Sequence, residues 1–117
     1  MREAVIVTLL GASAAGCAAR APTFDERVFA SQALIRAAEE VGVEEIPRAD
    51  LHLRLAREQV ERARRLSAEG APDRARRMLL RAQADAELAI ACAREARAQA
   101  LAREAVGEVG STQEQLR

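Results

Sequence analysis

The side chains that could do acid–base or nucleophilic chemistry are few and scattered in this sequence. His52 is the only histidine, whereas a metal site or an acid–base pair needs partner groups beside it. His52 is therefore expected to be a solvated surface residue. Asp85 follows Arg81 by four residues, a spacing that suits a surface ion pair on one helix. The sequence has no phosphate-binding loop, serine–histidine–aspartate set or Cys-x-x-Cys pair, so it predicts no enzyme, no metal site and no cofactor.

The two cysteines have different sequence surroundings. Cys92 borders a row of regularly spaced alanines. It is either a small buried apolar residue or, in an oxidising compartment, a bridge between two chains. Cys17 instead ends a segment with the features of an export signal, in which Arg2 precedes an apolar run over residues 4–10 and small residues fill 11–16. That run suits a signal-peptide core and is too short to span a bilayer, which takes about 20 apolar residues.

The end of this segment, Ala15-Gly16-Cys17, resembles the lipobox of bacterial lipoproteins. Ala14 departs from the pattern, because leucine is usual at that position. The resemblance implies that residues 1–16 are a signal peptide, that Cys17 carries the lipid, and that residues 17–23 form a tether. Ala18, standing where an aspartate would retain a lipoprotein in the inner membrane, implies the outer membrane. The alternatives are an ordinary secretory leader and an unprocessed helix.

Capping and breaking residues divide the rest of the sequence into three helices. Thr23 and Glu26 have capping-box spacing. Gly42 and Gly70 suit helix C-termini, and Pro72 suits a first turn. The predicted helices cover residues 24–41, 48–69 and 73–106. Together they form a helical domain over residues 24–106, followed by a polar flexible tail over 107–117.

Small apolar residues recur in these helices with alternating steps of four and three, which is a heptad pattern. The third helix carries Ala75, Leu79, Ala82, Ala86, Ala89, Ala93, Ala96 and Ala100. The second carries Ala49, Leu53, Ala56, Val60, Ala63 and Ser67, and the first carries Ala30, Leu34, Ala37 and Val41. A short connection makes the second and third helices antiparallel neighbours. We therefore predict an all-α fold, an alanine-rich antiparallel helical hairpin extended to a coiled-coil-like three-helix bundle. Its long third helix would overhang the other two.

Charge is balanced overall but unevenly distributed. The 18 basic residues, all arginine, match 18 acidic ones, so net charge predicts no nucleic-acid partner. Acidic residues dominate 25–50 and arginines dominate 62–81. In an up–down–up bundle the arginines would surround the second turn, close to the tether, and the acidic cluster would form the opposite tip. We expect an anionic lipid surface to be bound by Arg64, Arg65, Arg74 and Arg77. The alternative is a solvated surface without a partner.

Several segments together resemble a family of bacterial lipoprotein domains known as domain of unknown function 4398. They are Leu53-Arg54-Leu55-Ala56-Arg57 with Ala63, then Gly70, Asp73 and Ala75, then Gln83, Asp85 and Ala86. The resemblance covers about residues 28–98. It departs from the family after the turn glycine, where Ala71-Pro72 replaces a frequent aromatic residue. The resemblance implies a helical envelope domain and no established activity.

These observations lead us to expect a non-enzymatic lipoprotein anchored in the cell envelope, on the periplasmic face of a membrane. It would bind membrane lipid through acylated Cys17 and would act as a structural or interaction module. Its partner would be an envelope protein or the cell wall, and self-association through the overhanging helix is a further expectation. The alternative is a tetratricopeptide-like periplasmic adaptor or accessory subunit that grips a peptide or partner protein.

Overall fold

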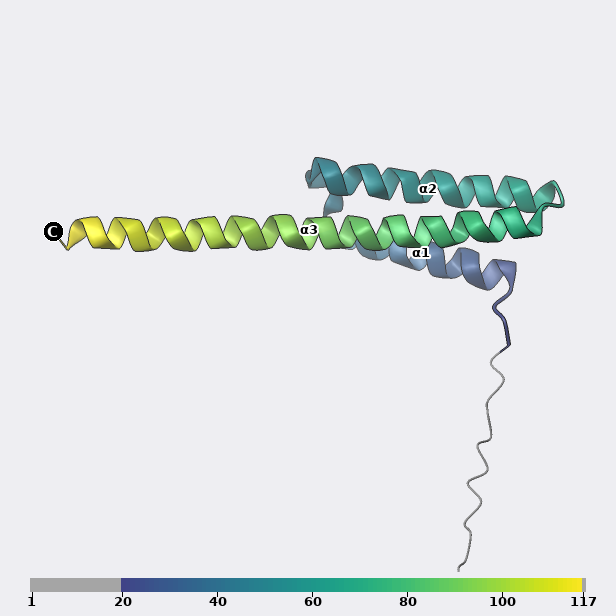
Figure 1. Ribbon diagram of the computed structural model, residues 1–117, viewed down its shortest axis with the longest axis horizontal. Helices are drawn as coiled ribbons and strands as arrows, with labels where there is room; N and C mark the ends of the chain where they lie inside the picture. Colours follow the sequence, from purple (N-terminus) through teal and green to yellow (C-terminus); the bar gives the residue numbers. More distant parts are fainter. Residues whose placement is uncertain (1–19, 117) are drawn as a thin grey trace, which may run out of the picture.

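The computed structural model describes residues 20–116 and confirms the predicted all-α architecture (Figure 1). Its elements are α1 (Phe24–Glu40), the short 3-10 helix η1 (Val43–Glu45), α2 (Pro47–Ala68) and α3 (Pro72–Gln115). No strand occurs within the described range. The helices run up, down and up, so α2 and α3 form an antiparallel hairpin and α1 lies along α3.

The N-terminus of α1 is fixed by the predicted capping box. The Thr23 hydroxyl accepts a hydrogen bond from the Glu26 N–H at 3.3 Å, and the Glu26 carboxylate accepts one from the Thr23 N–H at 2.6 Å. The bond from the Thr23 backbone is the main reason that the pKa of Glu26 is lowered; the Thr23 hydroxyl and Arg20 add to it. Because the pKa of Glu26 is lower in the folded state than in the unfolded state, the hydrogen bonds of its carboxylate stabilise the folded state near neutral pH. This stabilisation is lost as the pH falls through the lowered pKa.

Two glycines make the turns between helices possible. Gly42 and Gly70 have φ angles of 66° and 74°, the left-handed region that side chains with a Cβ rarely adopt. After Gly70, the Ala71 N–H donates to the Leu66 carbonyl at 2.9 Å, which satisfies an otherwise unpaired group at the end of α2. Proline then starts α3, as predicted, because its ring suits the first helical turn.

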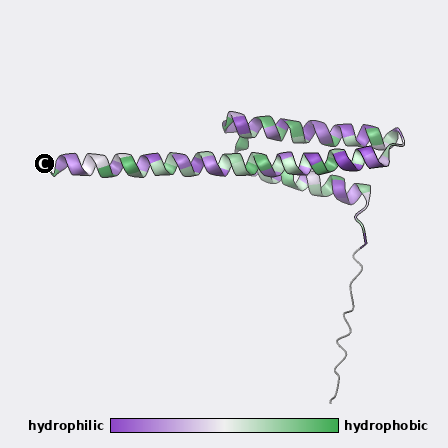
Figure 2. Ribbon diagram, in the orientation of Figure 1, coloured by the Kyte–Doolittle hydropathy of each residue, from purple (hydrophilic) through white to green (hydrophobic). Residues whose placement is uncertain are grey.

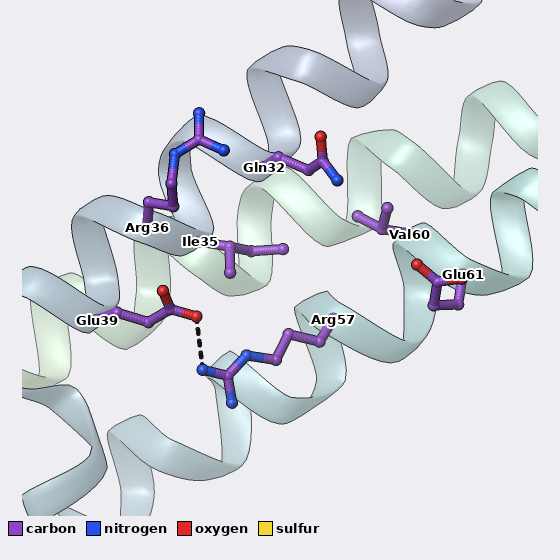
Figure 3. A pocket seen from close by; sticks show the side chains of 7 residues that line it. All are labelled: Gln32, Ile35, Arg36, Glu39, Arg57, Val60 and Glu61. Atoms are coloured by element: carbon purple, nitrogen blue, oxygen red, sulfur yellow. Dashed lines mark hydrogen bonds and ion pairs between the residues drawn. The ribbon is translucent and has the colours of Figure 1, made fainter.

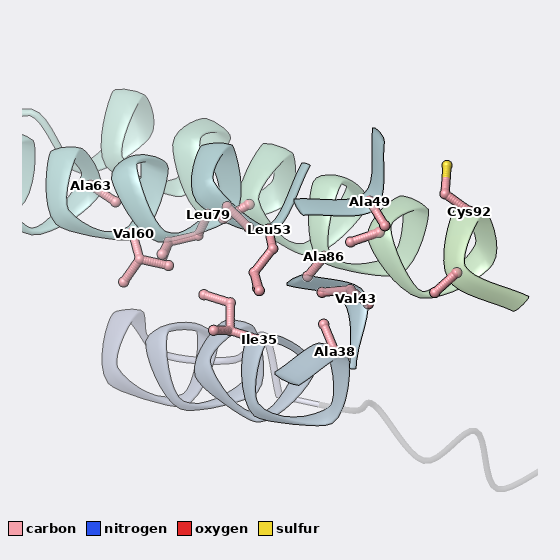
Figure 4. Close-up of a cluster of buried hydrophobic side chains, with 14 of the residues drawn as sticks. Ile35, Ala38, Val43, Ala49, Leu53, Val60, Ala63, Leu79, Ala86 and Cys92 are labelled. Carbon is pink, nitrogen blue, oxygen red and sulfur yellow. The ribbon is translucent and has the colours of Figure 1, made fainter. Parts of the chain in front are cut away.

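The alanine seam between α2 and α3 is confirmed. The predicted positions from Ala49 to Ala63 and from Ala75 to Ala93 are buried, and most are fully inaccessible. Figure 4 shows these small side chains between the helices, with Leu53 and Leu79 supplying most of the bulk. Alanine on both helices lets the two axes approach closely. The structure places Ser67 and Ala96 at the half-buried margins of this seam and leaves Ala100 exposed.

The predicted seam of the first helix was wrong by about one position. Instead of Ala30, Leu34, Ala37 and Val41, the buried residues of α1 are Val28, Ser31, Ile35 and Ala38. The reason is that this face brings the branched side chains Val28 and Ile35 into the core beside α3. A polar residue is tolerated there because the Ser31 hydroxyl donates to the Arg27 carbonyl at 2.9 Å.

The end predicted for the third helix was also wrong, because α3 continues through Gly107 and Gly110 to Gln115. A helical glycine costs only about 1 kcal/mol relative to alanine, so a glycine alone does not have to end a helix. At 1.5 Å per residue, α3 is about 66 Å long and α2 about 33 Å. The predicted overhang is therefore longer than expected (Figure 2), and all residues from Arg97 to Leu116 are exposed. As a result, the acidic connection between α1 and α2 lies beside the middle of the rod, not at its tip.

Candidate functional site

Four arginines surround a small cavity where α2 and α3 approach their connecting turn. Arg62 comes from α2, and Arg74, Arg77 and Arg81 come from successive turns of α3. They line a cavity of about 160 Å³, whose apolar part is formed by Leu66 and Met78. We call these four residues the arginine cluster.

The arginine cluster has no carboxylate to neutralise it. None of its members forms an ion pair with another residue between 20 and 116. Guanidinium groups present several N–H donors in a fixed plane and suit phosphate and carboxylate oxygens. The arrangement can therefore bind an anion, with the apolar cavity floor available to a non-polar group beside it.

The structure brings together only part of the predicted anion-binding set. Arg74 and Arg77 belong to the arginine cluster, but Arg64 points elsewhere and pairs with Glu61 at 2.6 Å. Arg65 lines a different, shallow cavity on α2. Arg62 also lines that second cavity, so it lies between the two cavities, whereas Arg64 and Arg65 do not line the cavity of the arginine cluster.

The start of the helical domain lies at the same end as the arginine cluster. Pro22 and Phe24 line a cavity together with Pro72 and Arg76 from the beginning of α3. This confirms the predicted position of the first helix beside the second turn. The predicted lipidation site, Cys17, lies outside the described residues and precedes Pro22 by five positions.

A polar cluster on the side of the hairpin corrects the predicted surface roles of His52 and Asp85. The His52 Nδ1–H donates to Asp85 Oδ1 at 2.9 Å, and Gln59 Nε2 donates to Asp85 Oδ2 at 2.7 Å. The His52 and Asp85 side chains are only 19% and 21% exposed. Asp85 thus bonds across to α2, whereas Arg81, its expected partner, belongs to the arginine cluster.

The signal for this polar cluster is present in the sequence. His52 and Gln59 are seven residues apart and each precedes a buried seam residue, which places them on the same edge of α2. Asp85 precedes the buried Ala86 and lies on the matching edge of α3. The sequence reasoning missed the contact because it considered neighbours four residues apart on one helix and not the facing edge of the other.

The polar cluster should contribute to stability because Asp85 accepts from both partners. Asp85→Ala is expected to lower the free energy of unfolding by about 1–2 kcal/mol, since it leaves two half-buried donors without an acceptor. Asp85→Asn should cost less, because its amide can still accept from His52. Chemical denaturation measures both effects. Glu87→Ala, at an exposed position of α3, is the control and should change stability by less than about 0.5 kcal/mol; an equal loss in both alanine variants would contradict the role of Asp85.

A groove separates α1 from α2, because α1 packs mainly along α3. It encloses about 280 Å³, and Ile35 and Val60 form its apolar floor (Figure 3). At one end Arg57 donates to Glu39 at 2.6 Å and to Glu44 at 3.0 Å. The bond to Glu39, followed by that to Glu44, raises the pKa of Arg57 above its ordinary value.

The sequence matches the family described as a domain of unknown function (DUF4398) over residues 26–105, more than half of the chain. The chain belongs to this family. The match begins in the first turn of α1 and ends in the overhanging part of α3, so the DUF4398 region contains the arginine cluster, the polar cluster and the groove. No curated protein and no solved structure matched this sequence.

The remaining chemistry-bearing residue of the DUF4398 region is Cys92. It is 6% exposed and packs in the core, which supports the interpretation as a small buried apolar residue over that of an interchain bridge. Between residues 20 and 116, no group of three or more His, Cys, Asp or Glu side chains is placed to hold a metal ion. None of the helices in this range is long and apolar enough to cross a membrane.

Proposed function

We propose that this protein is a non-enzymatic lipoprotein of the bacterial cell envelope, anchored through Cys17, most simply in the outer membrane. It acts as a structural or protein-interaction module that holds its long helix away from the lipid. The observation that carries this proposal is the position of the arginine cluster at the end of the bundle where the chain enters α1. A tether from Cys17 to Pro22 would hold that end close to the bilayer.

The charges at this end favour an anionic surface as the contact. Each arginine near anionic lipid contributes roughly 1 kcal/mol to binding, and the arginine cluster has no internal carboxylate to oppose it. With that end on the lipid, α3 runs away from the membrane for about 66 Å. The module would then present the overhang to an envelope protein, to the cell wall or to a second copy.

Vesicle binding of the full-length chain with Cys17→Ser tests the surface contact without the anchor. Vesicles that contain phosphatidylglycerol should bind it, and Arg74→Gln with Arg77→Gln should weaken this binding by about 30-fold, since two contacts of roughly 1 kcal/mol are lost. Co-sedimentation measures the affinity.

The matched control is Arg48→Gln with Arg103→Gln, which makes the same change in net charge far from the turn. This control should weaken binding only slightly. Equal losses in the two double variants would show that charge alone, and not the arginine cluster, governs binding. Fractionation of cells that express Cys17→Ala tests the anchor separately, because the unaltered protein should remain with the membranes and the variant should be released.

The groove between α1 and α2 favours a second candidate, an adaptor that grips a peptide or partner protein. Its apolar floor and the charged Arg36 and Glu61 on its walls offer both kinds of contact. A photo-crosslinker at Gln32, inside the groove, should capture a defined envelope protein if this function is correct. The same crosslinker at the exposed Phe29 is the control, and capture at both positions or at neither would contradict the adaptor.

A further inference from the structure

The overhang of α3 carries an exposed apolar stripe that no helix of the described chain covers. Its members follow at intervals of three and one, so they share one side of the helix. The stripe consists of Ala98, Leu101, Ala102, Ala105, Val106 and Val109. Leu101, Val106 and Val109 are 66%, 73% and 59% exposed. A contiguous apolar stripe of this kind marks a surface that a partner covers.

The stripe is symmetric about the bond between Arg103 and Glu104. Ala102, Leu101 and Ala98 lie one, two and five positions before Arg103. Ala105, Val106 and Val109 lie one, two and five positions after Glu104. A second copy of this helix that runs antiparallel, with its midpoint at the same place, therefore sets an apolar residue opposite each apolar residue of the first.

The charges beside the stripe select the same arrangement. Arg94 and Arg97 lie on one edge of the stripe, and Glu104 and Glu108 follow on that edge at heptad spacing. A two-fold axis perpendicular to the paired helices places this edge of one copy beside the same edge of the other copy. The two edges then run in opposite directions. Arg97 of one copy then lies within two positions of the level of Glu108 of the other, about 3 Å along the axis. Glu104, next to the midpoint, lies beside Glu104 of the other copy.

These charges are not neutralised within one chain. Glu104 and Glu108 are like charges four residues apart, which disfavours an isolated helix. Neither forms an ion pair with a residue between 20 and 116, and neither does Arg94. Arg97 donates to the Val41 carbonyl at the end of α1, which leaves other N–H donors of its guanidinium available. A second copy brings Glu108 close to an opposite charge, Arg97 of the other chain.

We infer that the overhangs of two copies pair as a symmetric antiparallel coiled coil centred between Arg103 and Glu104. The interface is the apolar stripe, and its polar border is the edge from Arg94 to Glu108. The two helical bundles then lie at opposite ends of a longer rod. This inference depends on residues of α3 alone. It sets the two arginine clusters at opposite ends of the rod, so two copies anchored in one membrane would pair with the rod lying along the surface, and not with α3 directed away from it.

Disulfide crosslinking between two singly substituted chains tests both pairing and direction. In a full-length background with Cys17→Ser and Cys92→Ala, one protein carries Ala98→Cys and the other Val109→Cys. Mixed under mild oxidation, they should form a crosslinked heterodimer. Each protein alone should not crosslink, because its two cysteines would be about 16 Å apart along the helix axis, too far for a disulfide.

The outcomes separate the possible arrangements. Crosslinking in each protein alone would indicate a parallel or shifted pair and would overturn the proposal. So would the absence of crosslinks in the mixture. Sedimentation analysis provides a second measurement, in which Leu101→Glu should raise the dimer dissociation constant more than about tenfold, because a two-fold axis places the substitution in the interface twice.

The matched control for this measurement is Phe29→Glu, which also replaces an apolar side chain with glutamate, at a residue of α1 that is likewise 66% exposed. This variant should dimerise as the unaltered protein does. A Leu101→Glu variant with unchanged association would contradict the proposed interface. Circular dichroism confirms that both variants keep their helices, so that loss of folding is not mistaken for loss of pairing.

Discussion

Leu79→Ala is expected to lower the free energy of unfolding by about 2–5 kcal/mol, the usual cost of removing a large buried side chain. Leu79 is fully buried between α2 and α3, and Leu53 is the only other fully buried leucine among residues 20–116. The other seam residues are mostly alanines, whose side chains are too small to move into the cavity that the substitution leaves. Thermal unfolding followed by circular dichroism should show a decrease in Tm of more than about 10 °C.

Leu80→Ala is the matched control, since it removes the same atoms from the next residue, which is 47% exposed. Its effect should remain below about 1 kcal/mol, because much of the side chain already contacts water. Similar losses of stability at the two positions would mean that the seam does not have the register described for α3.

Ala86→Leu is expected to be nearly as damaging, although it adds apolar atoms. Ala86 is fully buried where α3 faces both other helices. The added side chain has no space and must push the axes apart, which typically costs 1–3 kcal/mol in a well-packed core. Urea denaturation measures the loss.

The control for overpacking is Ala84→Leu, two residues away on the exposed side of α3. Leucine has nearly the helix propensity of alanine, so this variant should be close to neutral. If Ala86→Leu were neutral as well, the helices would not be in the close contact that the alanine seam requires.

Leu79→Ala and Ala86→Leu both test the close packing of the alanine seam. The first removes atoms from the seam and the second adds atoms to it. A seam of alanines removes little apolar area from water at each residue, so the few large side chains in the core contribute a large share of the stability. The close approach that alanine permits brings the polar edges of the helices into contact as well. This is why the hydrogen bonds of Asp85 with His52 and Gln59 can form across the hairpin.

The sequence was most informative where a local pattern repeats. The steps of four and three predicted correctly the buried positions from Ala49 to Ala63 in α2 and from Ala75 to Ala93 in α3, because heptad spacing leaves little choice of face. The pattern in these two helices failed only at its ends, at Ser67, Ala96 and Ala100. The capping box at Thr23 predicted the start of α1, since its hydrogen bonds involve only residues within one turn. Local rules failed at Gly107, where a glycine that could end a helix lies inside one.

The position of α1 and the partners across the hairpin were decided by the tertiary structure. Four small apolar residues of α1 fit a heptad as well as the observed set does, and only packing against α3 selected the face with Val28 and Ile35. The arginine cluster likewise depends on which residues of α2 meet α3 near the turn, and for that reason Arg62 and Arg81 were missed. By itself the sequence determined the helices, their order and the alanine seam, because these follow from spacing along one chain. Only the tertiary structure decided which side chains meet between helices, because those contacts depend on the rotation and offset of each helix against its neighbours.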